Sequence, residues 1–165
     1  MTRHPADDTV LSLPRPQPLP EHWQQPVTTA LASDESILSW LEIDLTQRLD
    51  YARGIVVLTT HRLLGRMADE REWQSFPLLD GLTLTRRDHS GVGNLELFDG
   101  TQRLAIWRYT LGGDIAAGRL IEHFTRRLTL VLTGAEPPRA AVALCPKCET
   151  PLLAGQEECP KCSKE

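Results

Sequence analysis

The hydrophobic period of this chain changes once, and that change limits how it can fold. Between about residues 28 and 110, apolar and polar residues alternate over short runs bounded by charged residues or glycine, which is the pattern of half-buried strands. From residue 112 to 134, GGDIAAGRLIEHFTRRLTLVLTG repeats its apolar residues every three or four positions. The sequence therefore predicts one amphipathic helix packed on a sheet, because the sheet is the only apolar partner that the pattern offers.

The alternating region divides into about seven short strands. SILSWLEID puts Ile37, Ser39, Leu41 and Ile43 on one side, QRLDYA follows after a break, and Arg53-Gly54 resembles a turn into IVVLTT. HRLLGR, WQSF and GLTLTR come next, and GNLELFDGTQRLAIWRYT is predicted to be a hairpin that turns at Asp99-Gly100. We expect an antiparallel meander, mainly β, closed by one C-terminal helix.

The helix has recognisable ends and an apolar stripe. Asp114 is the predicted N-cap, and Gly134 is the predicted C-terminal stop. The stripe that should face the sheet consists of Ala117, Ile121, Phe124, Leu128 and Val131.

The segments on either side of this domain have a different composition. Residues 1–27 hold half of the twelve prolines and lack apolar periodicity, so we expect a disordered, proline-rich lead, with LPRPQPLP as an alternative polyproline ligand. The domain is expected to span residues 28–134. Residues 135–144 form a linker, and residues 145–165 form a small cysteine-containing unit.

A meander of about seven strands followed by one helix resembles a pleckstrin-homology-like (PH-like) domain, in which the helix closes the end of a bent sheet or barrel. GIVVLTTHRLL resembles a stretch of bacterial PH-like domains in which an apolar strand runs into a Thr-x-x-Arg-Leu turn. Thr59, Arg62 and Leu63 take the motif's positions here. Residues 55–58 are uniformly apolar, as suits a central strand.

The order of segments carries a further resemblance. This order is similar to that of the N-terminal cytosolic region of a family of bacterial ABC exporters, some of them associated with cyanophycin metabolism. The similar segments are a proline-rich lead, LSWLEIDLTQRLDYARGIVVLTTHRLL, WQSFPL, DHSGVGNLELFD, LAIWRYTLG, a helix and a cysteine pair. The resemblance implies a regulatory region that precedes transmembrane and nucleotide-binding domains. The sequence contains no Walker-type loop, so ATP hydrolysis is not assigned to any of its residues.

The four cysteines have the spacing of a zinc ribbon. Cys145 and Cys148 form one CxxC unit, and Cys159 and Cys162 form a second unit after ten intervening residues. Two such units supply a tetrahedral shell of four thiolates for one structural Zn²⁺ and leave no open coordination position for catalysis. Two disulfides, a redox CxxC and an iron–sulfur centre are the alternatives.

Composition excludes several functions. A net charge of −4 argues against nucleic-acid binding through the phosphate backbone, which needs a clustered basic surface. No signal peptide or apolar run of about 20 residues is present in this sequence, so we expect a cytoplasmic chain that meets a membrane only through a missing C-terminal part.

No coherent catalytic set emerges. Asp88-His89-Ser90 contains the residue types of a hydrolase triad, but neighbours in sequence cannot face one another as that mechanism requires, so a solvated turn is the better interpretation. Four arginines near the first strand turns could form an anionic headgroup site, although Asp50 and the negative net charge argue against lipid binding. These four are Arg48, Arg53, Arg62 and Arg66.

The sequence thus favours a non-catalytic regulatory or protein-interaction module. Its partner would be another protein or the remaining domains of its own transporter. The alternative is a free-standing adaptor that binds a partner protein or an anionic lipid headgroup.

Overall fold

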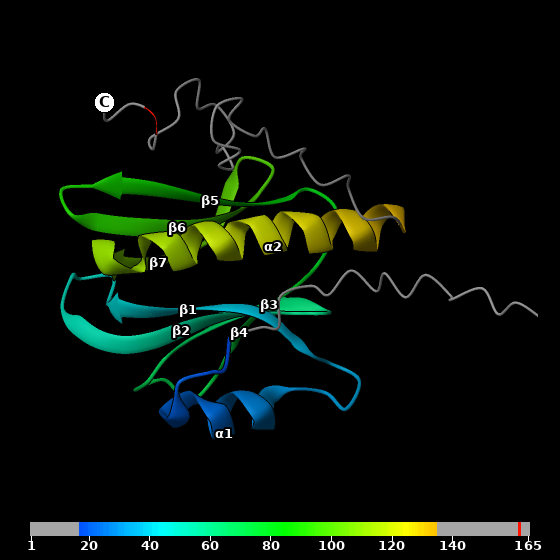
Figure 1. The fold of residues 1–165 in the computed structure, drawn as a ribbon, viewed down its shortest axis with the longest axis horizontal. Coiled ribbons are helices and arrows are strands. Elements are labelled where there is room, and N and C mark those ends of the chain that lie inside the picture. Colours follow the sequence, from blue (N-terminus) through cyan, green and yellow to red (C-terminus); the bar gives the residue numbers. More distant parts are fainter. Residues whose placement is uncertain (1–16, 135–161, 163–165) are drawn as a thin grey trace, which may run out of the picture.

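The computed structural model describes residues 17–134 and Cys162. Within these residues, two helices and seven strands follow one another, with one turn of 3₁₀ helix at Leu111–Gly113 (Figure 1). The elements are α1 Glu21–Ala30, β1 Ile37–Leu45, β2 Tyr51–Thr59, β3 Arg62–Met67, β4 Gln74–Pro77, β5 Leu82–His89, β6 Val92–Asp99, β7 Gln102–Thr110 and α2 Asp114–Thr133. The predicted mainly β architecture with a C-terminal helix is confirmed, and α1 is an addition to it.

All seven strands belong to one antiparallel sheet, in the order β4-β3-β2-β1-β7-β6-β5. The sheet has two halves, because β1 pairs extensively with β2 but meets β7 only at Leu45 and Arg108. Asp44 strengthens this junction: its carboxylate accepts hydrogen bonds from the backbone nitrogen and the hydroxyl of Thr110, at 2.8 and 2.7 Å. A sheet joined by so short a ladder can bend there, so that its halves enclose a common core.

Figure 1 shows α2 lying across the opening between the two halves of the sheet. The core beneath α2 takes residues from both halves, among them Leu41, Leu58, Leu95 and Trp107. Four α2 residues are buried in it: Ala117, Leu120, Phe124 and Leu128. The predicted stripe was therefore slightly misplaced. Leu120 joins the core, Ile121 is partly buried at its margin, and Val131 is largely exposed.

The helix begins differently from the prediction and ends as predicted. Gly113 occupies the N-cap position and has no side chain to cap the helix, while the carboxylate of Asp114, the first helical residue, accepts a hydrogen bond from Arg86 of β5. This ion pair fixes the start of α2 to the β5 edge of the sheet. Gly134 ends the helix in the left-handed conformation, with φ of 72°, which a glycine adopts at little cost.

The second helix, α1, corrects the predicted proline-rich lead of residues 1–27. Residues 1–16 lie outside the described residues, but residues 21–30 form a helix that packs on the outer face of β1–β4 (Figure 1). Trp23 and Val27, one helical turn apart, are buried there against Ile55, Val57 and Leu64.

Apolar burial explains why α1 forms although it contains Pro26. A proline inside a helix costs about 3 kcal/mol, because it removes a hydrogen bond and crowds the preceding turn. Burying an indole and a valine side chain contributes roughly 2 kcal/mol or more each, which is enough to offset that cost. Trp40 adds a hydrogen bond from its indole nitrogen to the carbonyl oxygen of Gln17, at 2.9 Å.

Two of the three predicted turns are confirmed. The β6–β7 hairpin turns at Gly100, which has φ of 59°, and β5 and β6 are joined by a two-residue turn at Ser90-Gly91, with φ of 50° and 83°. The turn predicted at Arg53-Gly54 was wrong, because β2 continues through both residues. The chain reverses earlier, between β1 and β2, at residues 46–50.

The predicted linker at 135–144 and most of the cysteine unit at 145–165 lie outside the described residues. Within the part that the structure describes, no helix is both long enough and apolar enough to span a bilayer.

Candidate functional site

A cavity of about 320 Å³ opens at the end of the sheet where β1 turns into β2. Its walls come from the ends of β1 and β3, the first residue of β4, the middle of β7, and the two connections at that end. The apolar part of the lining consists of Ile43, Leu45, Met67, Ile106 and Trp107. We call this space the mouth cavity.

One wall of the mouth cavity is rigid. The indole nitrogen of Trp107 donates a hydrogen bond to the side-chain oxygen of Gln74, at 3.0 Å. The same ring lies over Gly65, where a Cβ atom would come within 2.6 Å of the indole nitrogen. Glycine at position 65 therefore lets Trp107 lie flat on β3.

The β1–β2 connection is an ordered turn. The hydroxyl oxygen of Thr46 accepts hydrogen bonds from the backbone nitrogens of Arg48 and Asp50, both at 3.2 Å. The turn holds Leu49 at φ of 67°, a conformation that costs roughly 1 kcal/mol or more for a residue with a Cβ atom.

The turn exposes large apolar side chains beside the mouth cavity. Leu49 is 50 % exposed, and Tyr51, the first residue of β2, is 83 % exposed. Tyr51 pairs with Leu45 across the ladder, and Leu45 lines the cavity, so Tyr51 lies next to the cavity in the sheet. A strained backbone that holds apolar groups in solvent stabilises nothing within the described fold, and such features are typical of binding surfaces.

The charges around the mouth cavity are mixed, with an acidic excess. Arg48 and Arg108 contribute two cations, against the carboxylates of Asp50, Asp69 and Glu70. The Nε atom of Arg108 is buried and has no hydrogen-bond partner among the described residues. A site for a phosphorylated headgroup needs an excess of cations, so this lining suits a partner with both polar and apolar groups better.

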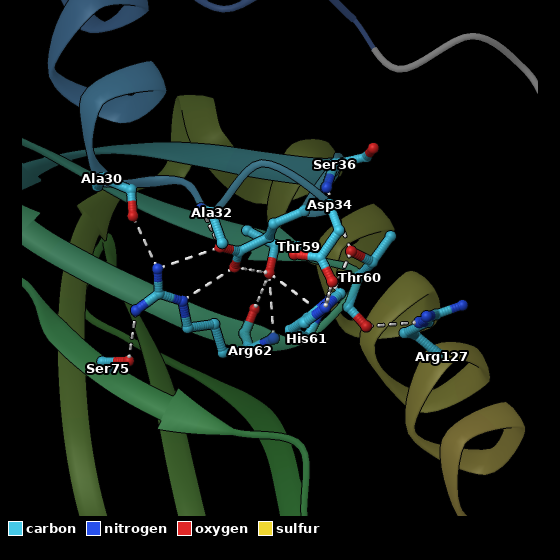
Figure 2. Close-up of polar contacts among 11 residues, drawn as sticks. Ala30, Ala32, Asp34, Ser36, Thr59, Thr60, His61, Arg62, Ser75 and Arg127 are labelled. Carbon is cyan, nitrogen blue, oxygen red and sulfur yellow. Dashed lines mark hydrogen bonds and ion pairs between the residues drawn. The ribbon is translucent and has the colours of Figure 1, made fainter.

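The opposite end of β2 carries a buried network of charged and polar side chains (Figure 2). Its centre is Glu35, whose side chain is only 1 % exposed. Arg62 donates from Nε and Nη2 to the two carboxylate oxygens, at 2.9 and 3.1 Å, and the hydroxyl of Thr59 donates at 2.5 Å. The backbone nitrogen of Ala32 adds a fourth donor, at 3.0 Å.

The same two side chains that contact Glu35 also reach neighbouring segments. Arg62 donates to the carbonyl oxygen of Ala30, at the end of α1, and to the hydroxyl of Ser75 in β4, at 2.8 and 3.2 Å. The hydroxyl oxygen of Thr59 accepts from the backbone nitrogens of His61 and Arg62, which shapes the β2–β3 turn. We call Glu35, Thr59 and Arg62, with these contacts, the corner network.

A second set of contacts extends the corner network to α2. The hydroxyl of Thr60 lies 2.8 Å from His61, whose other ring nitrogen lies 3.2 Å from the carboxylate of Asp34. Arg127 of α2 donates to the carbonyl oxygen of Thr60, at 3.0 Å (Figure 2). The corner therefore joins α1, the segment before β1, the β2–β3 turn, β4 and α2.

The pKa of Glu35 reports how strongly its carboxylate is held. Burial by itself would raise this pKa, because it disfavours the charged form. Hydrogen bonds from Arg62, Thr59 and Ala32, together with the charge of Arg62, outweigh that effect and lower the pKa from 4.5 to about 2. Four donors satisfy the carboxylate, and Glu35 is not among the residues that line the mouth cavity, so these contacts indicate a structural role.

Thr59 and Arg62 belong to the predicted turn motif, and both side chains bind Glu35 in the structure. Glu35 itself was missed, because no local pattern distinguishes it from exposed glutamates. Leu49 and Tyr51 were also missed, since the β1–β2 turn had been placed at Arg53-Gly54.

The structure does not bring the four candidate arginines of an anionic headgroup site together. Arg62 is held in the corner network, and Arg48 lines the mouth cavity at the other end of β2. Arg66 lies against the ring of Trp73, with 5.5 Å from its guanidinium carbon to the ring centroid, and Arg53 is exposed on β2. The four arginines therefore do not all face one site, because Arg62 lies at the far end of β2 and is bound to Glu35.

Asp88, His89 and Ser90 are exposed at the β5–β6 turn, as expected for a solvated hairpin. The described residues contain no hydrogen bond between their side chains, so they do not form a triad.

Three of the predicted zinc ligands, Cys145, Cys148 and Cys159, lie outside the described residues. Cys162 is described and half-buried. Residues 17–134 and Cys162 contain no group of three or more candidate metal ligands, so the zinc site stays a prediction.

Comparison with known proteins gives no match: no family model fits the chain, and no curated protein or solved structure is significantly similar to it.

The lowered pKa of Glu35 predicts how the protein responds to acid. A group with a lower pKa in the folded state stabilises the fold fully above its unfolded pKa, near 4.5, and loses that contribution as the pH falls through about 2. Glu35→Gln should lower the free energy of unfolding at pH 7 by roughly 3 kcal/mol and flatten its dependence on pH between about 5 and 2. Denaturant titrations across this range measure both effects.

Glu72→Gln is the matched control, because Glu72 is exposed and has no side-chain contact among the described residues. It should leave the unfolding curve at pH 7 within about 0.5 kcal/mol of the original. Equal effects of the two substitutions would contradict the structural role of the Glu35 carboxylate.

Proposed function

We propose that this chain is a non-catalytic protein-interaction module that takes its partner at the mouth cavity. The observation that carries the proposal is the β1–β2 turn. Its backbone is left-handed at Leu49, and the large side chains of Leu49 and Tyr51 are exposed beside a cavity. Tyrosine suits such a role, because its rigid ring buries a large area and its hydroxyl tolerates water.

The charges support a protein partner over a lipid. Two arginines and three carboxylates surround the cavity, so an anionic bilayer would meet net repulsion there. A protein segment with polar groups of both signs and one apolar side chain would fit the same lining.

The context of the module rests on the sequence. The order of its segments supports a cytoplasmic regulatory region at the N-terminus of a bacterial ABC exporter, whose remaining domains would then be the partner and would carry ATP hydrolysis and transport. A free-standing adaptor is the alternative and would use the same cavity. A reading frame that stops at Glu165 in the native gene would refute the exporter version.

The proposal includes one structural Zn²⁺ held by Cys145, Cys148, Cys159 and Cys162. Four thiolates are the donor set that tetrahedral zinc prefers, and a full shell supplies folding energy instead of reactivity.

For the partner site, we expect Leu49→Asn with Tyr51→Ser to weaken binding without unfolding the domain. Asparagine tolerates the left-handed backbone at position 49, and both side chains are exposed. A photo-crosslinking residue at Gln47, which lines the cavity, would be introduced into the full chain in cells of its native host. The double variant should lower the yield of the crosslinked product at least about fivefold, the loss of roughly 1 kcal/mol of contact.

Leu79→Asn is the matched control, because Leu79 is a similarly exposed leucine, at 61 %, in the β4–β5 connection at the other end of that half of the sheet. It should leave the crosslinked product unchanged. The proposal fails if both variants lower the yield equally, or if no discrete product forms at Gln47.

For zinc, metal analysis of the purified full chain should give one equivalent. Cys148→Ser should lower that stoichiometry, because it removes one of four thiolates. An unchanged metal content, or four cysteines that resist thiol reagents in the absence of metal, would contradict the zinc site and favour disulfides.

A further inference from the structure

A groove of about 400 Å³ lies on the outer face of the fold, between α1 and the β3–β4 side of the sheet. One side is formed by α1 residues spaced about one helical turn apart, Gln25 and Pro26 with Thr29 and Ala30. The other side is formed by Arg66, Arg71 and Trp73. We call it the outer groove, and it is separate from the mouth cavity.

The charged groups that line the outer groove are all cationic. Arg66 and Arg71 contribute guanidinium groups, and no carboxylate is among the lining residues. This sets it apart from the mouth cavity, where acidic residues outnumber basic ones. A groove with two fixed cations attracts an anion.

The hydrogen-bonding groups of the outer groove are mostly unused donors. The Nε atom of Arg66 donates a hydrogen bond to the carbonyl oxygen of Glu70, at 2.7 Å. Both terminal nitrogens of Arg66 have no partner among the described residues. The side chain of Arg71 has no partner there either. The hydroxyl of Thr29 donates to the carbonyl oxygen of Gln25, at 2.9 Å, while the Gln25 amide has no bond within the described part of the chain. A ligand rich in acceptor oxygens would satisfy these donors.

Packing fixes one of the two cations in place. The Arg66 guanidinium lies 5.5 Å from the centre of the Trp73 ring, and this ring packs edge-on against the buried Trp23 of α1, with 6.3 Å between centroids. The Nε bond and the ring contact together hold the free edge of the guanidinium in one orientation. A bound carboxylate would therefore cost little ordering of Arg66.

We propose that the outer groove binds an acidic peptide segment of a partner protein, with its carboxylates on Arg66 and Arg71. The floor supports a peptide, because Pro26, Ala30 and the Trp73 ring offer apolar surface to the side chains between the acids. An anionic bilayer fits less well. A flat surface would also meet the exposed carboxylates of Glu70 and Glu72, which flank Arg71 in sequence, and a chain of net charge −4. This inference goes beyond the proposed function, because it assigns a second surface and the chemistry of its ligand.

The test is an NMR titration of the full ¹⁵N-labelled chain with a peptide of eight glutamates. Amide shifts should change at residues 25–30 and 66–73, and Arg71→Gln should weaken binding about three- to tenfold, as expected for the loss of one charge-assisted contact. Arg87→Gln, an exposed arginine on β5 outside the groove, should change the affinity less than twofold. Leu49→Asn with Tyr51→Ser should leave this binding intact, which separates the outer groove from the mouth cavity.

Several outcomes would overturn the proposal. One is the absence of any amide shift with about 1 mM glutamate peptide. Another is equal amide shifts with a peptide of eight glutamines. The third is an equal loss of peptide affinity in Arg71→Gln and Arg87→Gln. Inorganic phosphate that competes fully at equal concentration would mean a simple anion site. Arg71-dependent binding to vesicles containing phosphatidylserine, with none to the glutamate peptide, would assign the groove to a membrane surface instead.

Discussion

The buried ion pair between Glu35 and Arg62 is the interaction on which the arrangement of this fold most depends. It lies where α1, the segment before β1, the β2–β3 turn and β4 meet, and Arg127 of α2 reaches the same corner. A carboxylate that is 1 % exposed would be costly without partners, but four donors surround it, so the charge is stabilised instead of expelled. Because Arg62 also holds the last turn of α1, this pair makes the N-terminal helix part of the domain.

With that corner fixed, the molecule has two surfaces of different character. The mouth cavity lies at the opposite end of β2, with mixed charge and two exposed apolar side chains on an ordered turn. The outer groove lies under α1, with two cations and unused donors. The β3–β4 connection contributes to both, since Asp69 and Glu70 border the first and Arg71 and Trp73 border the second. One short loop therefore borders both surfaces.

Periodicity predicted the larger part of the fold and missed what depends on long-range contacts. Alternation over β1 and β7 and the three-to-four spacing in α2 identified the strands and the helix, because each side chain's face follows from its local geometry. The helix α1 was missed, because the prolines in and before it dominate the local signal. Trp23 and Val27 are buried against residues of β2 and β3 that are more than 25 positions away in the sequence. Glu35 and Leu49 could not be found for a similar reason. The burial of one and the left-handed backbone of the other arise only in the folded chain.

A double-mutant cycle on Glu35 and Arg62 tests the central claim most directly. Free energies of unfolding would be measured for Glu35→Gln, Arg62→Gln and the double variant at pH 7. If the pair joins the segments at this corner, each single change leaves a buried group without its partner, and the double variant should be more stable than the sum of the two losses by about 2 kcal/mol or more. Losses that add within about 0.5 kcal/mol would show that the two side chains act independently and would contradict this account.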